Sequence, residues 1–452
     1  MSKDKNKSDK DFIWGVSTSN YQIEGAARED GRGLGIWDTF CRQGKIANND
    51  NADVACDHYH RYAEDVALMQ RIGVDAYRFS VSWPRLLPEG RGRVNEAGLA
   101  FYDRLLDRLL AAGIEPWLCL YHWDLPQALE DLGGWTARDS ATWFGDFAAL
   151  VGRRYGDRIK RIATFNEPAV FSLLGYAYGS HAPGKVDYDA LLKVIHNVNR
   201  AHGRAVDAIR ATVEGASIGS VHNVQPCRPA SDSAADRIAT ERFDEYWNRA
   251  FPQPQMLGTY PPQLGEALAP LIKPGDLVEI CRSTDWFGLN HYGPLYIKES
   301  TDMLKSGFGP VPAHIPRTSM GWPIEPDGLE ETLLMLDRTY ALPIFVMENG
   351  TATVDQVLAN GEVHDQDRID YLRGYIGAMD AAIAAGADVR GYFVWSLMDN
   401  FEWNSGYKER FGLVHVDYAT LQRRPKASAK WYGELIRARR YKKAASAMAS
   451  KR

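Results

Sequence analysis

Residues 101–123, FYDRLLDRLLAAGIEPWLCLYHW, contain the repeating unit that decides the fold. The first half is amphipathic, because Leu105 and Leu109 recur at helical spacing with charged residues on the opposite face. Gly113 is a typical helix stop, and the apolar run 114–120 that follows it predicts a buried strand. The stretch therefore predicts a helix, then a strand, and then a strand end with polar and aromatic side chains.

The same unit recurs along the chain. Eight segments predict strands, at 12–17, 74–80, 114–120, 162–166, 217–221, 286–290, 344–348 and 389–396. Apolar strands that alternate with helices indicate a parallel sheet covered on both faces, and eight of them close a barrel. We predict an α/β fold, a single-domain (β/α)8 TIM barrel over residues 11–440. Long loops are expected at 179–185, 226–234 and 298–326, on the C-terminal face of the strands.

The composition is that of a globular protein with a large core. Of 452 residues, 45% are hydrophobic and 25% are charged. Lys and Arg number 53 against 58 Asp and Glu, a net charge of −5 with no basic excess, so we expect no nucleic-acid partner. No run approaches the roughly 20 apolar residues of a membrane span, so no membrane partner is expected.

The two ends of the sequence are expected to lie outside the catalytic domain. Residues 1–10 are rich in Lys and Asp where a secretory signal would be apolar, so we expect a disordered tail and a cytoplasmic protein. Residues 441–452 form a basic C-terminal tail, expected to be a solvated helix end. The five cysteines have no paired spacing, and we expect them to be reduced.

Polar and aromatic residues stand at the ends of the predicted strands. In a barrel, these strand ends converge on one pocket although they lie far apart in sequence. The candidates are Arg78, His122, Trp123, Asn166, Glu167, His222, Asn223, Asn290, Tyr292, Glu348, Trp395 and Ser396.

Two of these candidates, Glu167 and Glu348, are carboxylates that follow apolar strands. A carboxylate in such a place is costly unless it is paired or used. Either one alone could pair with an arginine, and Asn349-Gly350 is also an ordinary turn. Two glutamates on opposite walls of one pocket are what glycoside hydrolysis requires, one as a proton donor and one as a nucleophile.

Other chemistries are less well matched. His58 and His60 lie two positions apart, which separates them on a helix, and the chain has no His-Glu-x-x-His motif. Neither a Gly-x-Ser-x-Gly elbow nor a glycine-rich phosphate loop follows a predicted strand. We therefore expect neither a metal nor a cofactor.

Seven motifs in order extend this interpretation over residues 12–432. They are FIWGVSTSNYQIEGA (12–26), YRFSVSWPRLLPEG (77–90), LYHWDLPQAL (120–129), TFNEP (164–168), DWFGLNHY (285–292), FVMENG (345–350) and YFVWSLMDNFEWNSGYKERFGLVHVD (392–417). On these motifs the chain resembles glycoside hydrolase family 1, of the β-glucosidase type.

The resemblance implies a role for each matching residue. Glu167 would be the general acid/base and Glu348 the nucleophile, with Arg78 and Tyr292 as neighbours that support it. The hydroxyls of the terminal sugar would be bound by Gln22, His122, Asn166, Glu402 and Trp403. Trp395 would lie under that sugar and Trp322 beside the leaving group, and the other substrate-binding candidates are Trp123, Asn290, Tyr292 and Phe411. His291 stands where many members have tyrosine, and its role is left open.

The resemblance implies a retaining β-glucosidase that acts on short or aryl β-glucosides through a covalent intermediate. This mechanism predicts carboxyl groups about 5 to 5.5 Å apart. Glu402 would repel a phosphate at C6, which disfavours the alternative of a phospho-β-glycosidase. Galactosidase, fucosidase or transglycosylating activity stays open, as does a catalytically inactive sugar-binding barrel. The expected partners are small β-glycosides and oligosaccharides, with a possible homo-oligomer.

Overall fold

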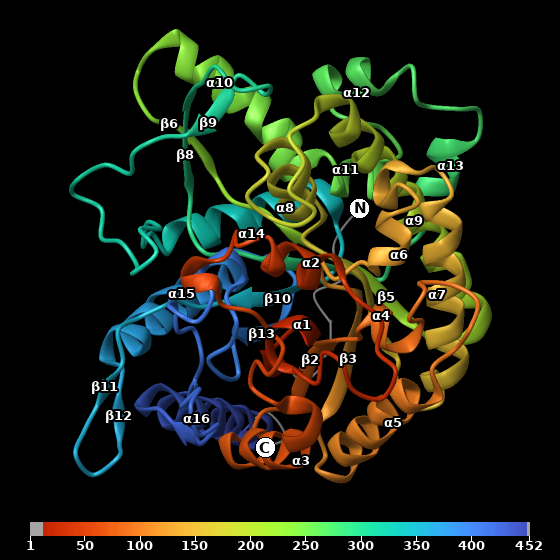
Figure 1. Ribbon diagram of the computed structural model, residues 1–452. Coiled ribbons are helices and arrows are strands. Elements are labelled where there is room, and N and C mark those ends of the chain that lie inside the picture. Colours follow the sequence, from red (N-terminus) through yellow and green to blue (C-terminus); the bar gives the residue numbers. More distant parts are fainter. Residues whose placement is uncertain (1–11, 450–452) are drawn as a thin grey trace.

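The protein is a closed barrel of eight parallel strands surrounded by helices (Figure 1). The computed structural model describes residues 12–449. The barrel strands are β1 (Ile13–Ser17), β2 (Ala76–Ser80), β3 (Glu115–Tyr121), β4 (Arg161–Asn166), β5 (Ser217–Asn223), β7 (Trp286–Asn290), β10 (Ile344–Asn349) and β13 (Val389–Trp395). Their order around the barrel is β1-β13-β10-β7-β5-β4-β3-β2.

The predicted fold class is confirmed, and each predicted strand overlaps one strand of the barrel. The largest differences are at β2, which starts at Ala76, and at β5, which continues to Asn223. β5 is longer because it keeps pairing with β7 up to Asn223 and Asn290. α5 (Glu96–Ala111) buries Leu105 and Leu109, and the stop at Gly113 has a φ of +72°, a left-handed conformation that favours glycine.

Long helices form the outer layer. They are α3 (His58–Ile72), α5, α7 (Ser140–Tyr155), α9 (Tyr188–Thr212), α10 (Ala234–Asp244), α14 (Asp327–Tyr340), α15 (Gln366–Ala384) and α16 (Ala427–Ala449). Shorter helices lie in the connections: α1 (Asn20–Ile23), α2 (Ile36–Arg42), η1 (Ala47–Asn49), α4 (Trp83–Leu86), α6 (Gln127–Glu130), η2 (Gly134–Thr136), α8 (Pro168–Ser172), η3 (Leu173–Ala177), η4 (Glu245–Arg249), α11 (Pro252–Leu257), α12 (Pro262–Leu268), α13 (Asp276–Ile280) and η5 (Trp403–Ser405).

The predicted tails coincide only partly with the described residues. Residues 1–10 lie outside them. At the other end, α16 continues to Ala449 without a break at the predicted domain boundary after residue 440, and residues 450–452 lie outside the described part. No helix among the described residues is long and apolar enough to cross a membrane.

Aromatic side chains fill the N-terminal half of the barrel interior. Trp117, Trp286, Phe345 and Phe393 form one buried cluster, with the ring centroid of Trp117 4.8 to 5.3 Å from the other three. Gly219 leaves room for Trp286, because a Cβ atom there would lie 2.4 Å from its ring. This packing closes the barrel below its middle and confines the functional cavity to the C-terminal half.

Two of the predicted loops contain short strands. Residues 226–234 and 298–326 contribute to a three-stranded sheet of β6 (Cys227–Pro229), β8 (Leu295–Glu299) and β9 (Ser306–Phe308), which lies beside α10 (Figure 1). Two further pairs are β11 (Gln356–Val357) with β12 (Val363–His364), and β14 (Val414–Val416) with β15 (Arg423–Pro425). The expectation of irregular loops is therefore only partly correct, because strands of two or three residues are too short to show a periodic pattern.

Candidate active site

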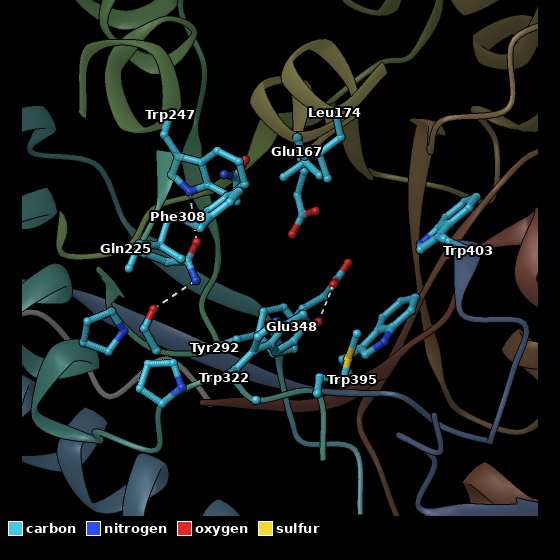
Figure 2. Close-up of a pocket in the computed structure, with 18 of the residues that line it drawn as sticks. Glu167, Leu174, Gln225, Trp247, Tyr292, Phe308, Trp322, Glu348, Trp395 and Trp403 are labelled. Atoms are coloured by element: carbon cyan, nitrogen blue, oxygen red, sulfur yellow. Dashed lines mark hydrogen bonds between the residues drawn. The ribbon is translucent and has the colours of Figure 1, made fainter. Parts of the chain in front are cut away.

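A cavity of about 440 Å³ lies at the C-terminal ends of the barrel strands. Its lining includes eleven predicted site residues: His122, Trp123, Glu167, Asn223, Tyr292, Trp322, Glu348, Trp395, Glu402, Trp403 and Phe411. Figure 2 shows the carboxyl groups of Glu167 and Glu348 directed into the same open space from different walls. Residues 181 positions apart (348 − 167) thus share one cavity.

Glu348 is buried at the end of β10 and is held by two donors. The Arg78 guanidinium donates to Oε1, and the Tyr292 hydroxyl donates to Oε2 at 2.8 Å. Burial raises the pKa of Glu348, whereas Arg78 and Tyr292 act in the opposite direction by stabilising the charged form. Both carboxylate oxygens are therefore engaged, and the group is fixed in orientation.

Glu167 follows β4 with a φ of +47°, a left-handed conformation that is uncommon for a residue with a side chain. Asn290 Nδ2 donates to Glu167 Oε1 at 2.8 Å. Burial, and then the charge of Glu348, raises the pKa of Glu167 to about 8. Glu348 has a cation beside it and Glu167 does not, so a proton shared between the two carboxyl groups resides on Glu167.

Asn166 lies behind the cavity wall and connects the partners of the two glutamates, Arg78 and Asn290, to His122. Its Oδ1 accepts from Arg78 and, at 3.0 Å, from Asn290, and its Nδ2 donates to His122 Nε2 at 3.0 Å. Burial, and then Arg78, lowers the pKa of His122 well below its usual range, so the imidazole is neutral. With Nε2 accepting, the proton is assigned to Nδ1, which is buried and has no hydrogen-bond partner among the described residues.

Glu402 is the third carboxylate of the cavity. Gln22 Nε2 lies 3.3 Å from Glu402 Oε2, and it also donates to the carbonyl oxygen of Phe401 at 2.8 Å. Burial, and then the charges of Glu348 and Glu167, raises the pKa of Glu402 to about 8. A protonated carboxyl group can both donate and accept, which suits a pair of sugar hydroxyls.

Aromatic rings enclose the space around these polar groups. The ring centroids of Trp123 and Trp403 lie 4.5 Å apart, and those of His122 and Trp395 lie 5.9 Å apart. The faces of such rings suit the apolar C–H faces of a pyranose.

The outer half of the cavity is mainly apolar. Its walls come from η3, η4, β9 and the segments next to them, and they include Val170, Leu174, Trp247, Phe308, Val311 and Met320. The Gln225 side chain lines this half, but its amide already donates to the Gly293 carbonyl and accepts from Trp247 Nε1, each at 2.9 Å. Asn223 differs, because it is 5% exposed and neither polar atom of its amide has a partner among the described residues.

The remaining predicted residues do not line the cavity. Gln22, Arg78, Asn166 and Asn290 lie behind it and bond to residues that do, namely Glu402, Glu348, His122 and Glu167 in that order. His222 packs against Phe287, and the Ser396 hydroxyl donates to the Met398 carbonyl. His291 is buried outside the lining, where its Nδ1 lies 2.9 Å from the Val224 carbonyl oxygen.

Apart from Asn223 and Trp322, the residues of the outer half were not singled out in the sequence. Leu174, Trp247 and Phe308 lie outside the barrel strands, and an apolar residue in a connection gives no signal that separates a cavity wall from ordinary packing. The proximity of Trp247 and Phe308, with ring centroids 5.9 Å apart, depends on the small β6-β8-β9 sheet.

One group among the described residues has the spacing of a metal site. Ligand atoms of Asp355, Asp399 and His415 lie within 4.8 Å of one another, outside the cavity lining. Lys426 Nζ contacts both carboxylates of this group, at 2.8 and 2.7 Å.

Comparison with known proteins identifies the family. Residues 4–441 match glycosyl hydrolase family 1. β-Glucosidase A of Thermotoga maritima is 44% identical over 94% of this chain and 97% of its own, and β-glucosidase A of Acetivibrio thermocellus is 44% identical over 95% and 98%. The structure of the Thermotoga maritima β-glucosidase in complex with glucoimidazole superimposes with a TM-score of 0.90, over 94% of this chain and 98% of that one. The chain belongs to glycosyl hydrolase family 1.

Proposed function

We propose that the chain is a retaining β-glucosidase that removes the terminal non-reducing glucosyl residue from short or aryl β-glucosides. The observation that carries this proposal is the unequal environment of two glutamates in one cavity. Glu348 accepts from Arg78 and Tyr292, whereas Glu167 accepts from the neutral amide of Asn290. Such a pair supplies one ionised and one protonated carboxyl group at the same pH.

In the first step, the Glu348 carboxylate attacks the anomeric carbon of the sugar. The bond from that carbon to the glycosidic oxygen breaks, and Glu167 transfers its proton to this oxygen, so the leaving group departs as a neutral alcohol. The product is a glucosyl ester of Glu348. The Tyr292 hydroxyl and Arg78 hold the two oxygens of Glu348, so the carboxylate meets the sugar in a fixed orientation.

In the second step, water replaces Glu348. The charge of Glu348 is absent from the ester, so one cause of the raised pKa of Glu167 is removed and Glu167 acts as a base. It takes a proton from water, the oxygen of that water bonds to the anomeric carbon, and the ester bond breaks. Two inversions at the same carbon give net retention of configuration.

The charges of the cavity support a substrate without phosphate. Its described lining contains three carboxylates, Glu167, Glu348 and Glu402, and no Lys or Arg. Three acidic groups with no facing cation disfavour a dianionic ligand. The predominantly apolar outer half supports an aryl or alkyl leaving group.

Azide rescue tests the two assigned roles. In Glu348→Gly, hydrolysis of a dinitrophenyl β-glucoside should fall on the order of 10⁵-fold, and added azide should yield the α-glucosyl azide. In the matched Glu167→Gly variant, azide should yield the β-glucosyl azide, because the glucosyl ester still forms and azide replaces water. Full hydrolytic activity in Glu348→Gly, or the same azide anomer from both variants, would refute the assignment.

A further inference from the structure

A lysine lies at the centre of a buried acidic cluster outside the cavity. Lys426 Nζ lies 2.7 Å from Asp399 Oδ1 and 2.8 Å from Asp355 Oδ2. His415 Nδ1 completes the group, 3.1 Å from Asp355 Oδ2. Lys426 is 1% exposed and Asp399 is fully buried. Two carboxylates and an imidazole at this spacing resemble the ligands of a divalent cation, and here the cation is the ammonium group of the chain itself.

The cluster joins two segments next to cavity residues to the start of the C-terminal helix. Asp355 lies in the connection that follows Glu348 and β10, and Asp399 lies in the segment between Trp395 and Glu402. Lys426 stands directly before α16, and its backbone N–H donates to the Leu413 carbonyl at 2.9 Å. The ammonium therefore ties two loops of the site to the base of the C-terminal helix.

A continuous series of contacts leads from Asp399 to the cavity. Asp399 Oδ1 accepts from the backbone N–H of Gly412 at 3.0 Å, next to Phe411 in the cavity wall. Its neighbour Asn400 accepts from Gln22 Nε2 at 3.0 Å, and the same Gln22 nitrogen lies 3.3 Å from Glu402. A shift of Asp399 would thus move both sides of the sugar-binding half.

Arg410 gives Asp399 a second cationic partner, at 2.6 Å from Oδ2. Asp399 would keep this partner if Lys426 were lost, whereas its Oδ1 would retain only the Gly412 N–H. A buried carboxylate that loses a charged partner moves or takes up solvent. Loss of Lys426 is therefore expected to shift the Asp399 side chain, while the ion pair between Asp399 and Arg410 keeps this part of the chain folded.

We propose that Lys426 is a positioning residue for the glucosyl-binding half of the cavity, acting as a built-in cation between Asp355 and Asp399. It touches no substrate. The inference rests on the proposed function, because it concerns the geometry in which that reaction occurs. It differs from a purely structural role in that an external ammonium ion of suitable size should restore activity once the lysine side chain has been removed.

The test compares three variants of the full chain. Lys426→Ala leaves a space for a small cation, Lys426→Met fills that space with a neutral side chain, and Lys430→Ala removes an exposed lysine from the adjoining helix α16. We expect Lys426→Ala to lower kcat/KM on an aryl β-glucoside about 100-fold and to weaken deoxynojirimycin binding, measured by calorimetry, about tenfold. Ethylammonium should restore at least a tenth of wild-type kcat/KM to Lys426→Ala and nothing to Lys426→Met, and Lys430→Ala should behave as wild type.

The double variant Asp355→Asn/Lys426→Met provides a test that does not require Lys426→Ala to fold. It removes one positive and one negative charge together, so the buried region stays balanced. We expect a folded protein that binds deoxynojirimycin about tenfold more weakly than wild type. Wild-type affinity in this variant, or equal ethylammonium responses in Lys426→Ala and Lys426→Met, would overturn the proposal. Failure of the proposed function would appear differently, as a wild-type protein without β-glucosidase activity.

Discussion

The two halves of the cavity are built in different ways. The inner half comes from barrel strand ends and the segments directly after them, and its polar groups bond to one another through Asn166 and Gln22. The outer half comes chiefly from helices and a small sheet added to the barrel, together with the end of β5, and it presents mainly apolar side chains such as Leu174 and Phe308. In the outer half, Gln225 is occupied by internal hydrogen bonds, whereas the buried amide of Asn223 has no partner among residues 12–449.

This difference indicates a division of tasks. A rigid polar half can demand one arrangement of hydroxyls, because a mismatched hydroxyl leaves buried polar groups unpaired. An apolar half discriminates weakly, because an added or missing methylene changes binding by only about 1 to 3 kcal/mol. We therefore expect strict selection of the terminal sugar and broad tolerance of the leaving group.

The largest effect that separates the halves should come from Glu167→Gln. We expect kcat/KM on an alkyl β-glucoside to fall about 10³-fold, because this leaving group needs a proton. A dinitrophenyl β-glucoside leaves without one, so its loss should be at least tenfold smaller. Rates on both substrates, measured side by side, check the expectation, and equal losses would contradict the role of Glu167 as the acid.

Glu402→Ala tests the inner half alone. Loss of a buried carboxyl group that bonds to sugar hydroxyls should lower kcat/KM about 100-fold on every glucoside, without changing the order of preference among leaving groups. Glu409→Ala is the matched control, because Glu409 is also a buried carboxylate but lies outside the cavity lining. A change in leaving-group preference in Glu402→Ala would show that the halves are not independent.

The same variant has a pH-dependent effect on stability. The folded-state pKa of Glu402, about 8, lies above the ordinary value of 4.5, so its charge is disfavoured in the folded protein. The free-energy cost of ionising Glu402 in the folded protein is absent below the ordinary pKa of 4.5. It grows as the pH rises from 4.5 to 8 and is complete above pH 8. Glu402→Ala should therefore gain stability above pH 8, with an upper bound of about 5 kcal/mol, and nothing near pH 4. Unfolding at both pH values checks the sign.

The acid role of Glu167 also predicts the alkaline limit of activity. Glu167 must be protonated in the free enzyme, and its pKa is raised to about 8. Accordingly, kcat/KM on an alkyl glucoside should fall about tenfold per pH unit above this pH. This alkaline fall in kcat/KM should be absent from the residual activity of Glu167→Gln. An unchanged fall in that variant would show that another group causes it.

The smallest effect should come from the outer half. Phe308 lines the cavity yet is 47% exposed, so Phe308→Ala should lower kcat/KM about fivefold for aryl leaving groups and less for methyl β-glucoside. Ile238→Ala on α10 removes an exposed apolar side chain outside the lining and serves as the control. An equal loss on aryl and methyl glucosides would place the effect of Phe308 in the fold and not in leaving-group contact.

The same contrast separates what the sequence could predict from what it could not. The barrel and the family were predicted and are confirmed, and the predicted β-glucosidase function agrees with the names of relatives that are 44% identical. Glu167 and Glu348 could be singled out because a carboxylate after a buried strand conflicts with its surroundings. Trp247 and Phe308 conflict with nothing in the sequence, and their place in the cavity depends on strands of three residues. His222 was a wrong candidate, because alternate strand residues point outward and it faces Phe287.

The buried aromatic cluster of Trp117, Trp286, Phe345 and Phe393 also determines the order in which products leave and water enters. Because these rings close the barrel below the cavity, glucose and the leaving group depart on the C-terminal side of the strands. The leaving group must depart from the outer half of the cavity before water can enter. An alcohol that binds there in place of water will accept the glucosyl unit. The balance between hydrolysis and transglycosylation therefore depends on whether water or an alcohol occupies the outer half of the cavity, and not on the chemistry of the two glutamates.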